Sequence, residues 1–525
     1  MERQALKRME QSYIEQFRED LHEFYEVTDK FYKKEISVAE YKSFSGAFGS
    51  YAQRGGERSM LRLRLSGGEI NKENLKFIAD SIQKYQINLV HLTTCQTVQL
   101  HNLTKETVCA LAGEAFEHGI ITRGGGGDYP RNVMCSPLSG VADGEAFDVL
   151  PYAKEAADYL LGFIGKVKLP RKLKVCFSNN KENETHATFR DMGFVANENL
   201  TFDVYIAGGL GIKPKMGVLA AEGIKPSKIL YCIKTMVEIF TQYGNYEKRS
   251  ASRTRFLQET LGVEELQRIF REKLAGNLET ENLDIAVNAS EIDKKGGTVR
   301  PPAGQRLIKQ KQEGLYAVSY HPVGGVPNPA FFKELYDAIL PMEQVKVRLA
   351  PDQGLYVINL SGAEAEKILE ITKEDGGTAF ERSTACIGAA VCQVGIGNSQ
   401  ALLASCIKRV KEANLADGVL PPIHVSGCPS SCSAHQTAII GLRGGKKQTA
   451  DGPKDAFAIY INGNAWIGQE RFGEEIGVMT AENIPEFFVE LGRAVEKEGL
   501  CFTEFLERYP ERIAAIFETV ENGKV

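Results

Sequence analysis

The sequence predicts an α+β protein whose chain is internally duplicated, and three observations carry that prediction. A shift of 257 residues lays residues 67–103 over residues 324–360 without a gap, with eleven identities in 37 positions. Each copy reads strand, Gly-Gly turn, amphipathic helix, strand, turn, strand, which is a split βαβ pattern. A second, looser match pairs FDVYIAG at residues 202–208 with FAIYING at residues 457–463, at a shift of 255.

Length and composition exclude several classes of protein. At roughly 150 residues per domain, the 525 residues are enough for several domains. No run approaches the roughly 18 apolar residues of a membrane helix, and the charged start MERQALKRME lacks the apolar core of a signal peptide. The net charge of -5 gives no broad basic surface for nucleic acid. We therefore expect a cytoplasmic protein that binds neither nucleic acid nor a membrane.

Four of the eleven cysteines form two closely spaced pairs. STACIGAAVC contains Cys386 and Cys392, and SGCPSSC contains Cys428 and Cys432. Structural zinc favours tighter spacings, whereas iron-sulfur clusters take four cysteines at more varied intervals. The small residues around both pairs would let the backbone approach a cluster and donate N–H groups to its sulfurs. The spacing therefore favours an iron-sulfur cluster over structural zinc, with buried structural cysteines as the alternative.

The two cysteine pairs, together with the duplicated unit, resemble the sulfite and nitrite reductase family, whose members carry sirohaem next to a 4Fe-4S cluster. The resemblance covers nearly all of the chain from about residue 45 onward. It implies an α+β fold of two ferredoxin-like half-domains and two α/β domains that bind sirohaem and cluster, with pseudo-two-fold symmetry. It also assigns Cys432 as the thiolate that bridges the cluster and the sirohaem iron, and Cys386, Cys392 and Cys428 as the remaining cluster ligands.

The resemblance and the composition together predict a domain organisation. The helical spacing from Leu6 to Leu21 indicates an N-terminal extension, and the polar, Gly- and Pro-containing residues 291–304 indicate a linker between the halves. The expected parts are a helical extension (1–45), ferredoxin-like half-domain 1 (46–118), a sirohaem and substrate domain (119–290), ferredoxin-like half-domain 2 (300–375) and a 4Fe-4S and sirohaem domain (376–525).

Three short motifs carry the cations that an acidic cofactor and an oxyanion need. Arg62 and Arg64 alternate in LRLRL, so both project from one face of a strand. Arg131 follows a glycine run that would permit close approach of a flat ring, and Lys172 and Lys174 lie in LPRKLK. Each motif alone is typical of a solvated surface. The resemblance instead implies that Arg62, Arg131, Lys172 and Lys174 bind the substrate and deliver protons, and that Arg64 contacts the cofactor.

The threonine-rich turn HLTTCQTVQLH departs from the family pattern. Cys95 stands where the family has an arginine that generally meets cofactor carboxylates, so one ion pair is expected to be missing or replaced, for example by Arg64. Gln96 and Gln99 still match the family's cofactor-binding positions. Cys95 is either a tolerated substitution or a thiol that faces the cofactor.

The resemblance implies a six-electron reductase of a small anion. Reduction of sulfite to sulfide is the preferred reaction. Sulfite reductases of the family read Arg-Lys-x-Lys, and Lys174 is the last residue of this motif here. Nitrite reductases of the family have Asn at the position of Lys174. An additional cation suits a dianion over a monoanion. Reduction of nitrite to ammonia, as in ferredoxin-nitrite reductases, is the alternative.

Two further possibilities remain open from the sequence. One is a non-catalytic iron-sulfur binding protein, and the other is a sirohaem-free relative that uses its cluster for oxygen chemistry in corrinoid synthesis. No G-x-G-x-x-G motif follows a predicted strand, so electrons are expected from a separate protein. Reduced ferredoxin is the favoured donor by resemblance, and a flavoprotein is the second choice.

Overall fold

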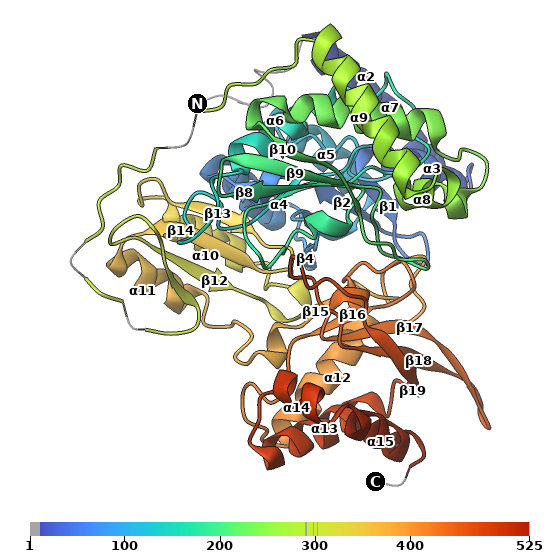
Figure 1. Ribbon diagram of the computed structural model, residues 1–525, viewed down its shortest axis with the longest axis vertical. Coiled ribbons are helices and arrows are strands. Elements are labelled where there is room, and N and C mark those ends of the chain that lie inside the picture. Colours follow the sequence, from blue (N-terminus) through green and yellow to red (C-terminus); the bar gives the residue numbers. More distant parts are fainter. Residues whose placement is uncertain (1–10, 289–290, 298, 302, 524–525) are drawn as a thin grey trace. The chain divides into compact units, whose positions relative to one another are not determined.

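The computed structural model describes residues 11–288, 291–297, 299–301 and 303–523, and these divide into two compact units (Figure 1). The larger unit takes the chain up to Gly209, together with Pro214–Tyr320 and Pro327–Lys373. The smaller unit takes Glu374 to the C-terminus, together with the short segments Leu210–Lys213 and His321–Val326. Leu6, where the predicted N-terminal helical pattern begins, lies outside the described residues.

The larger unit begins with two helices, α2 (Gln11–Tyr32) and α3 (Val38–Ser45). Phe17, Phe24 and Phe31 of α2 are all buried, because residues seven apart lie on the same face of an α-helix. The α3 helix starts with a capping box in which Ser37 and Glu40 each accept a hydrogen bond from the other's backbone N–H. α2 packs on α5 (Lys105–Glu117), so the N-terminal helices cover the first half-domain.

The first copy of the repeat forms a four-stranded antiparallel sheet in the order β1-β2-β5-β4. Alternation along β2 buries Leu61 and Leu63 in the core, and it leaves Arg62 half-buried on the opposite face. The strands are β1 (Ser50–Ala52), β2 (Ser59–Leu63), β4 (Val90–Leu92) and β5 (Val98–Leu103), and α4 (Lys72–Lys84) packs with α5 on the core.

The second copy forms a five-stranded sheet in the order β11-β12-β14-β13-β3. The last strand belongs to the first copy, and it pairs Ile70 with Val347. α10 packs against α4, so the two copies share one hydrophobic core. The elements are β3 (Glu69–Ile70), β11 (Leu307–Lys309), β12 (Tyr316–Tyr320), β13 (Lys346–Leu349), β14 (Leu355–Leu360), α10 (Phe331–Ile339) and α11 (Gly362–Ile371).

The two copies match element by element at the predicted shift of 257 residues. β12 and β14 have the bounds of β2 and β5 moved by that number. The Gly-Gly turn after the first strand is also repeated, with φ of +63° at Gly67 and +59° at Gly324. Only glycine adopts this left-handed conformation without a steric cost, so both copies need the residue there. The predicted duplication is confirmed.

The rest of the larger unit is built on a mixed sheet in the order β10-β9-β8-β7-β6. β6, β7 and β8 are parallel, and β9 and β10 are antiparallel to their neighbours. In its core Phe177 stacks on Phe194, and Phe202 meets both rings edge-on. α7 and α9 help to cover this core. The elements are β6 (Met134–Cys135), β7 (Val175–Ser178), β8 (Met192–Asn197), β9 (Thr201–Ile206), β10 (Val218–Ile224), α6 (Leu150–Leu161), α7 (Ile229–Tyr243), α8 (Leu257–Thr260) and α9 (Val263–Thr280).

The smaller unit repeats this sheet in the order β15-β16-β17-β18-β19, with the same sequence of parallel and antiparallel pairs. The predicted α+β class is therefore confirmed, with both parts of the chain duplicated. The elements are β15 (Thr384–Ala385), β16 (Ile423–Ser426), β17 (Ile440–Thr449), β18 (Gly452–Ile461), β19 (Glu474–Thr480), α12 (Ser399–Glu412), α13 (Ile484–Glu498), α14 (Phe502–Arg508) and α15 (Pro510–Glu521).

The loop that follows the central parallel strand is alike in the two sheets. A short 3-10 helix, Ala187–Phe189 in one sheet and His435–Thr437 in the other, lies 248 residues apart. A left-handed residue four positions before each helix start is also repeated, since Asn183 has φ of +52° and Ser431 has φ of +54°. The same shift places Glu184 where the second sheet has Cys432. Loops after parallel strands are the usual place for ligands.

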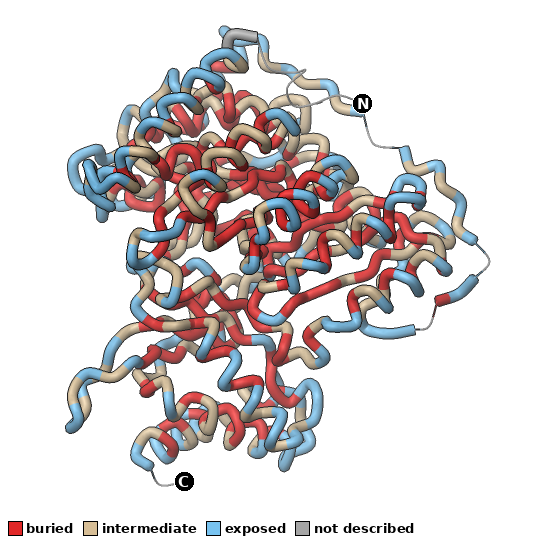
Figure 2. Tube along the Cα trace, turned by 180° about the vertical axis from the view of Figure 1, so that it is seen from behind, coloured by how far each residue is buried: buried red, intermediate tan, exposed pale blue. Residues whose placement is uncertain are grey.

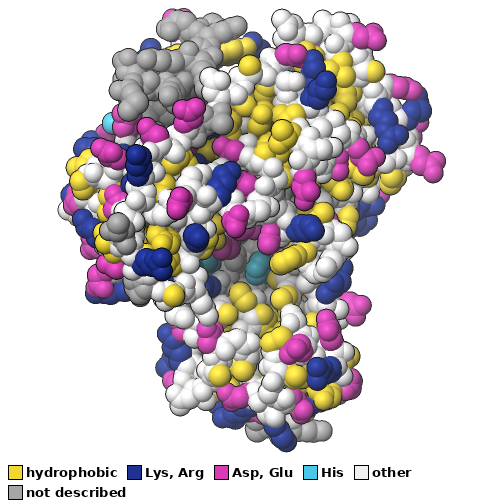
Figure 3. Space-filling view, turned by 60° about the vertical axis from the view of Figure 1, so that its left-hand side comes forward, with side chains coloured by type: hydrophobic (Ala, Val, Ile, Leu, Met, Phe, Trp, Pro, Cys, Tyr) yellow, Lys and Arg dark blue, Asp and Glu magenta, His cyan; other side chains and the backbone are white. Residues whose placement is uncertain are grey.

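Buried residues run along the strands of every sheet, and exposed residues lie on the outer turns of the helices (Figure 2). On the face shown in Figure 3, basic and acidic side chains are interspersed, without a large area of one sign. Within the described part of the chain, no helix is both long and apolar enough to cross a membrane.

Candidate functional site

The four predicted substrate contacts lie in the larger unit, and the structure brings them into one group of basic side chains. Arg62 comes from β2, Arg131 from the loop before β6, and Lys172 and Lys174 from the segment that enters β7. Two arginines that the sequence did not single out join them from the loops around the short 3-10 helices η3 (Ala187–Phe189) and η6 (Thr254–Phe256). We call this group the cationic cluster: Arg62, Arg131, Lys172, Lys174, Arg190 and Arg253.

Arg62 and Arg131 are fixed by the glycine run that precedes Arg131. The guanidinium groups donate to the carbonyl of Gly125 at 2.5 Å and 2.8 Å, and Arg131 also donates to the carbonyl of Gly127 at 2.7 Å. Burial lowers the pKa of Arg131 to about 10, with Arg62 adding to the effect and the phenol of Tyr51 opposing it. Both forks are therefore held in place before any ligand arrives.

The structure gives a different reason from the expected one for the glycines that precede Arg131. We expected this run to let a flat ring approach the backbone, but the run packs against the protein's own chain. A Cβ on Gly126 would lie 2.2 Å from the carbonyl oxygen of Gly46, and one on Gly125 would lie 2.9 Å from the Cα of Gly49. Close contact between these two backbone segments requires glycine and positions the carbonyls that hold Arg131.

Arg64, the predicted cofactor contact, projects to the same side as Arg62 and reaches the same loop. It is only 8% exposed, and its guanidinium donates to the backbone carbonyls of Arg123 at 2.7 Å and Arg131 at 3.2 Å. Burial and the nearby Arg131 lower the pKa of Arg64 to about 10. In the structure Arg64 thus supports the loop that carries Arg131.

Lys174 contacts a buried acidic residue, Asp191, that the sequence analysis missed. The carboxylate of Asp191 accepts hydrogen bonds from Arg253 Nη2 at 2.9 Å, from the Lys174 backbone N–H at 2.9 Å and from Thr254 Oγ1. Burial raises the pKa of Asp191, but Arg253 and these hydrogen bonds outweigh it and lower the pKa. Asp191 therefore anchors the segment from which both lysines project.

Burial also lowers the pKa of both lysines. For Lys172, the neighbouring Arg253 and Lys174 add to the effect and take the pKa well below its usual range. For Lys174, the thiol of Cys95 opposes the effect. A lysine with a lowered pKa releases a proton more readily than an exposed one, which suits a proton donor.

Cys95, which departs from the family pattern, lies in the turn between β4 and β5 and is half-buried. Lys174 Nζ donates to its Sγ at 3.4 Å. Burial would raise the pKa of Cys95, but the charges of Lys174, Arg190 and Arg62 outweigh it and lower the pKa to about 6. The thiol is thus largely ionised at neutral pH, next to a predicted substrate contact.

Gln96 and Gln99, the two predicted cofactor contacts of the same turn, have different surroundings. Gln96 is fully buried and donates to the carbonyls of Cys135 at 2.8 Å and Leu349 at 2.6 Å, so it joins the two copies of the repeat. In the amide orientation that satisfies both its oxygen and its nitrogen, Gln99 accepts hydrogen bonds from Arg62 Nε at 3.1 Å and Nη2 at 2.6 Å. Gln99 therefore lies against the cationic cluster, whereas Gln96 serves the fold.

The donor set of the cationic cluster fits a large polyanionic group. Six basic side chains gather there, and the buried Nε atoms of Arg131 and Arg253 have no hydrogen-bond partner among the described residues. Buried N–H groups are normally satisfied, so these two are candidates for contact with a ligand. The carboxylates of sirohaem and the oxygens of an oxyanion are both acceptors of the required kind.

The four predicted cluster cysteines all lie in the smaller unit. Gly427 N–H donates to Cys386 Sγ at 3.1 Å, and the hydroxyl of Ser399 lies 3.2 Å from the same sulfur. Burial raises the pKa of Cys386, these hydrogen bonds oppose it, and the nearby Cys428 adds to it. Backbone N–H groups directed at a thiolate are typical of iron-sulfur ligands.

The glycines beside these cysteines are required by close packing. A Cβ on Gly427 would lie 2.6 Å from the carbonyl oxygen of Gly397, and Gly388 has φ of +72°. Cys428 is buried, Cys392 is half-buried and Cys432 is exposed. Among the described residues, no three His, Cys, Asp or Glu side chains are placed to hold a single metal ion. The thiolates of a 4Fe-4S cluster bind four different irons and need not converge on one point.

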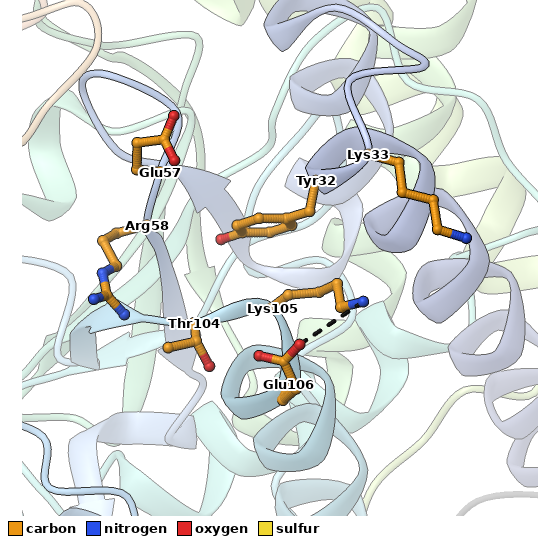
Figure 4. A pocket seen from close by; sticks show the side chains of 7 residues that line it. All are labelled: Tyr32, Lys33, Glu57, Arg58, Thr104, Lys105 and Glu106. Atoms are coloured by element: carbon orange, nitrogen blue, oxygen red, sulfur yellow. Dashed lines mark ion pairs between the residues drawn. The ribbon is translucent and has the colours of Figure 1, made fainter.

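A surface pocket beside the first turn of α5 contains none of the predicted site residues. Its volume is about 280 Å³, and it lies beside the start of α5, where Lys105 forms an ion pair with Glu106 at 3.7 Å (Figure 4). Lys105 also binds Asp29 at 2.9 Å. Its lining is polar and largely paired: Tyr32, Lys33, Glu57, Arg58, Thr104, Lys105 and Glu106.

Comparisons with known proteins bear on the same segments. A family model described as the nitrite and sulphite reductase 4Fe-4S domain matches residues 126–278, and the nitrite/sulfite reductase ferredoxin-like half domain matches residues 51–115. The first match holds Arg131, Lys172 and Lys174 but none of the four predicted cluster cysteines. The duplication explains this, because residues 126–278 contain the copy of the sheet whose counterpart carries those cysteines.

Curated relatives resemble the chain along most of its length. An assimilatory ferredoxin-dependent nitrite reductase of Haloferax mediterranei is 25% identical in sequence, and the alignment covers 90% of this chain and 86% of the relative. A sulfite reductase [ferredoxin] of Mycolicibacterium paratuberculosis is 22% identical, and the alignment covers 86% of this chain and 82% of the relative. The solved structure of the Mycobacterium tuberculosis NirA protein has a TM-score of 0.75 at 20% identity, covers 92% of both chains and shares the fold.

Proposed function

Because the chain belongs to the nitrite and sulfite reductase family, we propose that it reduces a small oxyanion by six electrons, with sulfite to sulfide as the preferred reaction. The cationic cluster carries this proposal, since it gathers six basic side chains from the two segments that the family models match. Family members hold sirohaem and a 4Fe-4S cluster. When bound, the cluster would supply electrons one at a time, and the sirohaem would supply the iron that binds the anion.

The chain offers separate donor sets for the two cofactors. Cys386, Cys392, Cys428 and Cys432 would hold the 4Fe-4S cluster, with the N–H group of Gly427 already directed at the first of them. The cationic cluster would hold the sirohaem carboxylates, together with Gln99 and the unsatisfied N–H groups of its two buried arginines. Cys432 would be the thiolate shared between the two groups, as the family resemblance implies.

The cations also have a task toward the substrate. The guanidinium forks of Arg62 and Arg131 are fixed by the Gly125 carbonyl, so they would bind the oxygens of the anion without being ordered at each turnover. Each oxygen that leaves as water takes two protons. Lys172 and Lys174 would donate protons from Nζ, and their lowered pKa values favour that transfer.

Sulfite is preferred because Lys174 adds a cation where nitrite reductases of the family place a neutral Asn. The attraction between charges scales with the charge on the anion, so the additional cation favours a dianion. Nitrite to ammonia is the second candidate. Relatives from Haloferax mediterranei and Synechococcus elongatus are nitrite reductases, at 25% and 24% identity, and Cys95 partly offsets the charge of Lys174.

We also propose reduced ferredoxin as the electron donor. The curated relatives of both kinds carry ferredoxin in their names. A flavoprotein donor is the alternative, and turnover with each purified donor would separate the two.

The test is a spectrum followed by a kinetic comparison on the purified holoenzyme. A Soret band and a long-wavelength chlorin band are expected, and kcat/KM with reduced methyl viologen is expected to be higher for sulfite than for nitrite. Protein that lacks a macrocycle after reconstitution with iron, sulfide and sirohaem would contradict the reductase. A higher kcat/KM for nitrite would replace the preferred substrate by the alternative.

A further inference from the structure

Cys95 and Lys174 form a contact between the unusual residue of the turn and a proposed substrate contact. The ammonium group donates to Cys95 Sγ at 3.4 Å, within the range of an N–H to sulfur hydrogen bond. The two residues are 79 positions apart in the sequence and come from different sheets of the larger unit. The contact thus depends on the tertiary fold, and the sequence did not reveal it.

The surroundings of Cys95 are strongly basic. Lys174 enters from the segment before β7, Arg190 from the loop after η3, and Arg62 from β2. Arg131 also interacts with the sulfur, and Cys176 lies close enough to sense its charge. Lys174 in turn faces Arg190, Arg253 and the carboxylate of Asp191. An anion at Cys95 is therefore attracted from three separate segments.

We infer that Cys95 is a positioning residue that acts as a thiolate counter-ion of Lys174 and keeps the Lys174 side chain charged and in place within the cationic cluster. Without a nearby negative charge, burial and the arginines around it would favour a neutral Lys174. The arginine that the family has at this position would repel Lys174, whereas a thiolate pairs with it. The role of Lys174 toward the substrate rests on the proposed function, whereas the ionisation of Cys95 and its contact with Lys174 do not.

The second copy of the repeat supplies a charge-preserving replacement. Asp352 stands at the position equivalent to Cys95, in the same turn, and its carboxylate accepts a hydrogen bond from Gly354 N–H at 2.7 Å. The turn thus accommodates a short acidic side chain. Cys95→Asp keeps a negative charge beside Lys174, and Cys95→Ser keeps the shape of the side chain but removes the charge.

The first measurement is infrared difference spectroscopy of the holoenzyme between pH 5 and pH 8, in the S–H stretching region. The wild type is expected to lose one S–H band on raising the pH, and Cys95→Ser to lose none. The thiols of Cys109 and Cys176 stay protonated over this range, because burial raises the pKa of each to about 11. Cys109→Ser, which removes another half-buried thiol, should therefore keep the wild-type change. Identical difference spectra for the wild type and Cys95→Ser would overturn the inference.

The second measurement is the pH profile of kcat with nitrite, whose protonation is constant over this range. Loss of the counter-ion should lower the pKa of Lys174. The alkaline limb of the kcat profile of Cys95→Ser should therefore move to lower pH by about 1–3 units, the usual effect of a close opposite charge. Cys95→Asp should restore the wild-type limb. An unchanged limb in Cys95→Ser would overturn the inference while the proposed function stands. A wild-type holoenzyme that reduces neither anion would contradict the proposed function, and the infrared result would still decide the thiolate.

Discussion

Arg62 and Arg131 donate hydrogen bonds to one backbone oxygen, the carbonyl of Gly125, at 2.5 Å and 2.8 Å. Two guanidinium groups would repel each other, so a shared acceptor between them is what holds them side by side. Their relative position is therefore set by the glycine run and not by the ligand. Such preorganised donors stabilise developing charge without the cost of reordering at each turnover.

Arg131→Lys should lower kcat/KM for the preferred anion by roughly 10- to 1000-fold, as for the loss of one preorganised donor. A single ammonium group cannot donate to the carbonyls of Gly125 and Gly127 and also present an N–H to the ligand. Steady-state kinetics with reduced methyl viologen would measure the loss. Arg268→Lys, at an exposed position of α9, should leave kcat/KM unchanged. Wild-type activity in Arg131→Lys would remove Arg131 from the proposed site.

Lys174→Asn should lower kcat/KM for sulfite more than for nitrite, by a ratio of roughly tenfold, because the lost charge attracts a dianion more strongly. The measurement is a side-by-side comparison of both anions on the same preparation. The exposed Lys181→Asn serves as the control, since it removes a lysine of the same domain outside the cationic cluster. If Lys174→Asn changes both activities by the same factor, the argument for sulfite fails.

The sequence predicted more of the fold than of the site. The duplication was readable because β2 and β12, and β5 and β14, keep the same spacing along the chain. Arg190, Arg253 and Asp191 could not be predicted in the same way. They come from irregular loops without a motif, and only the order of strands in the sheet brings them to Lys174. Their signal in the sequence is weak, limited to charged residues in otherwise apolar surroundings such as HATFRD.

Cys432→Ser should disturb both cofactors if this thiolate is the shared ligand of the cluster and the sirohaem, as we propose. Iron content, the optical spectrum and the paramagnetic signal of the reduced cluster would all change. Cys406→Ser is the matched control, since Cys406 is a fully buried thiol of α12 in the same unit and has no predicted ligand role. Full cofactor content in Cys432→Ser would contradict the assignment of this residue.

Glu184 occupies the place in the first sheet that Cys432 holds in the second, and it should make the stability of the protein depend on pH. Burial, with the nearby Asp352 adding to it, raises the pKa of Glu184 from 4.5 to about 7. The folded state therefore binds a proton more tightly than the unfolded state between these two pH values, so stability falls as the pH rises through this range. Below pH 4.5 the carboxyl is protonated in both states and costs nothing.

Glu184→Gln removes this titration, so it should stabilise the protein above pH 7 and have little effect near pH 4.5. The gain in the free energy of unfolding at pH 8 should be at most about 3 kcal/mol, from the size of the pKa shift. Urea unfolding of both proteins at pH 5 and pH 8 would measure the difference. Glu198→Gln is the control, because Glu198 is exposed in the turn between β8 and β9 of the same sheet. Equal stability of Glu184→Gln and wild type at both pH values would show that Glu184 ionises freely in the folded protein.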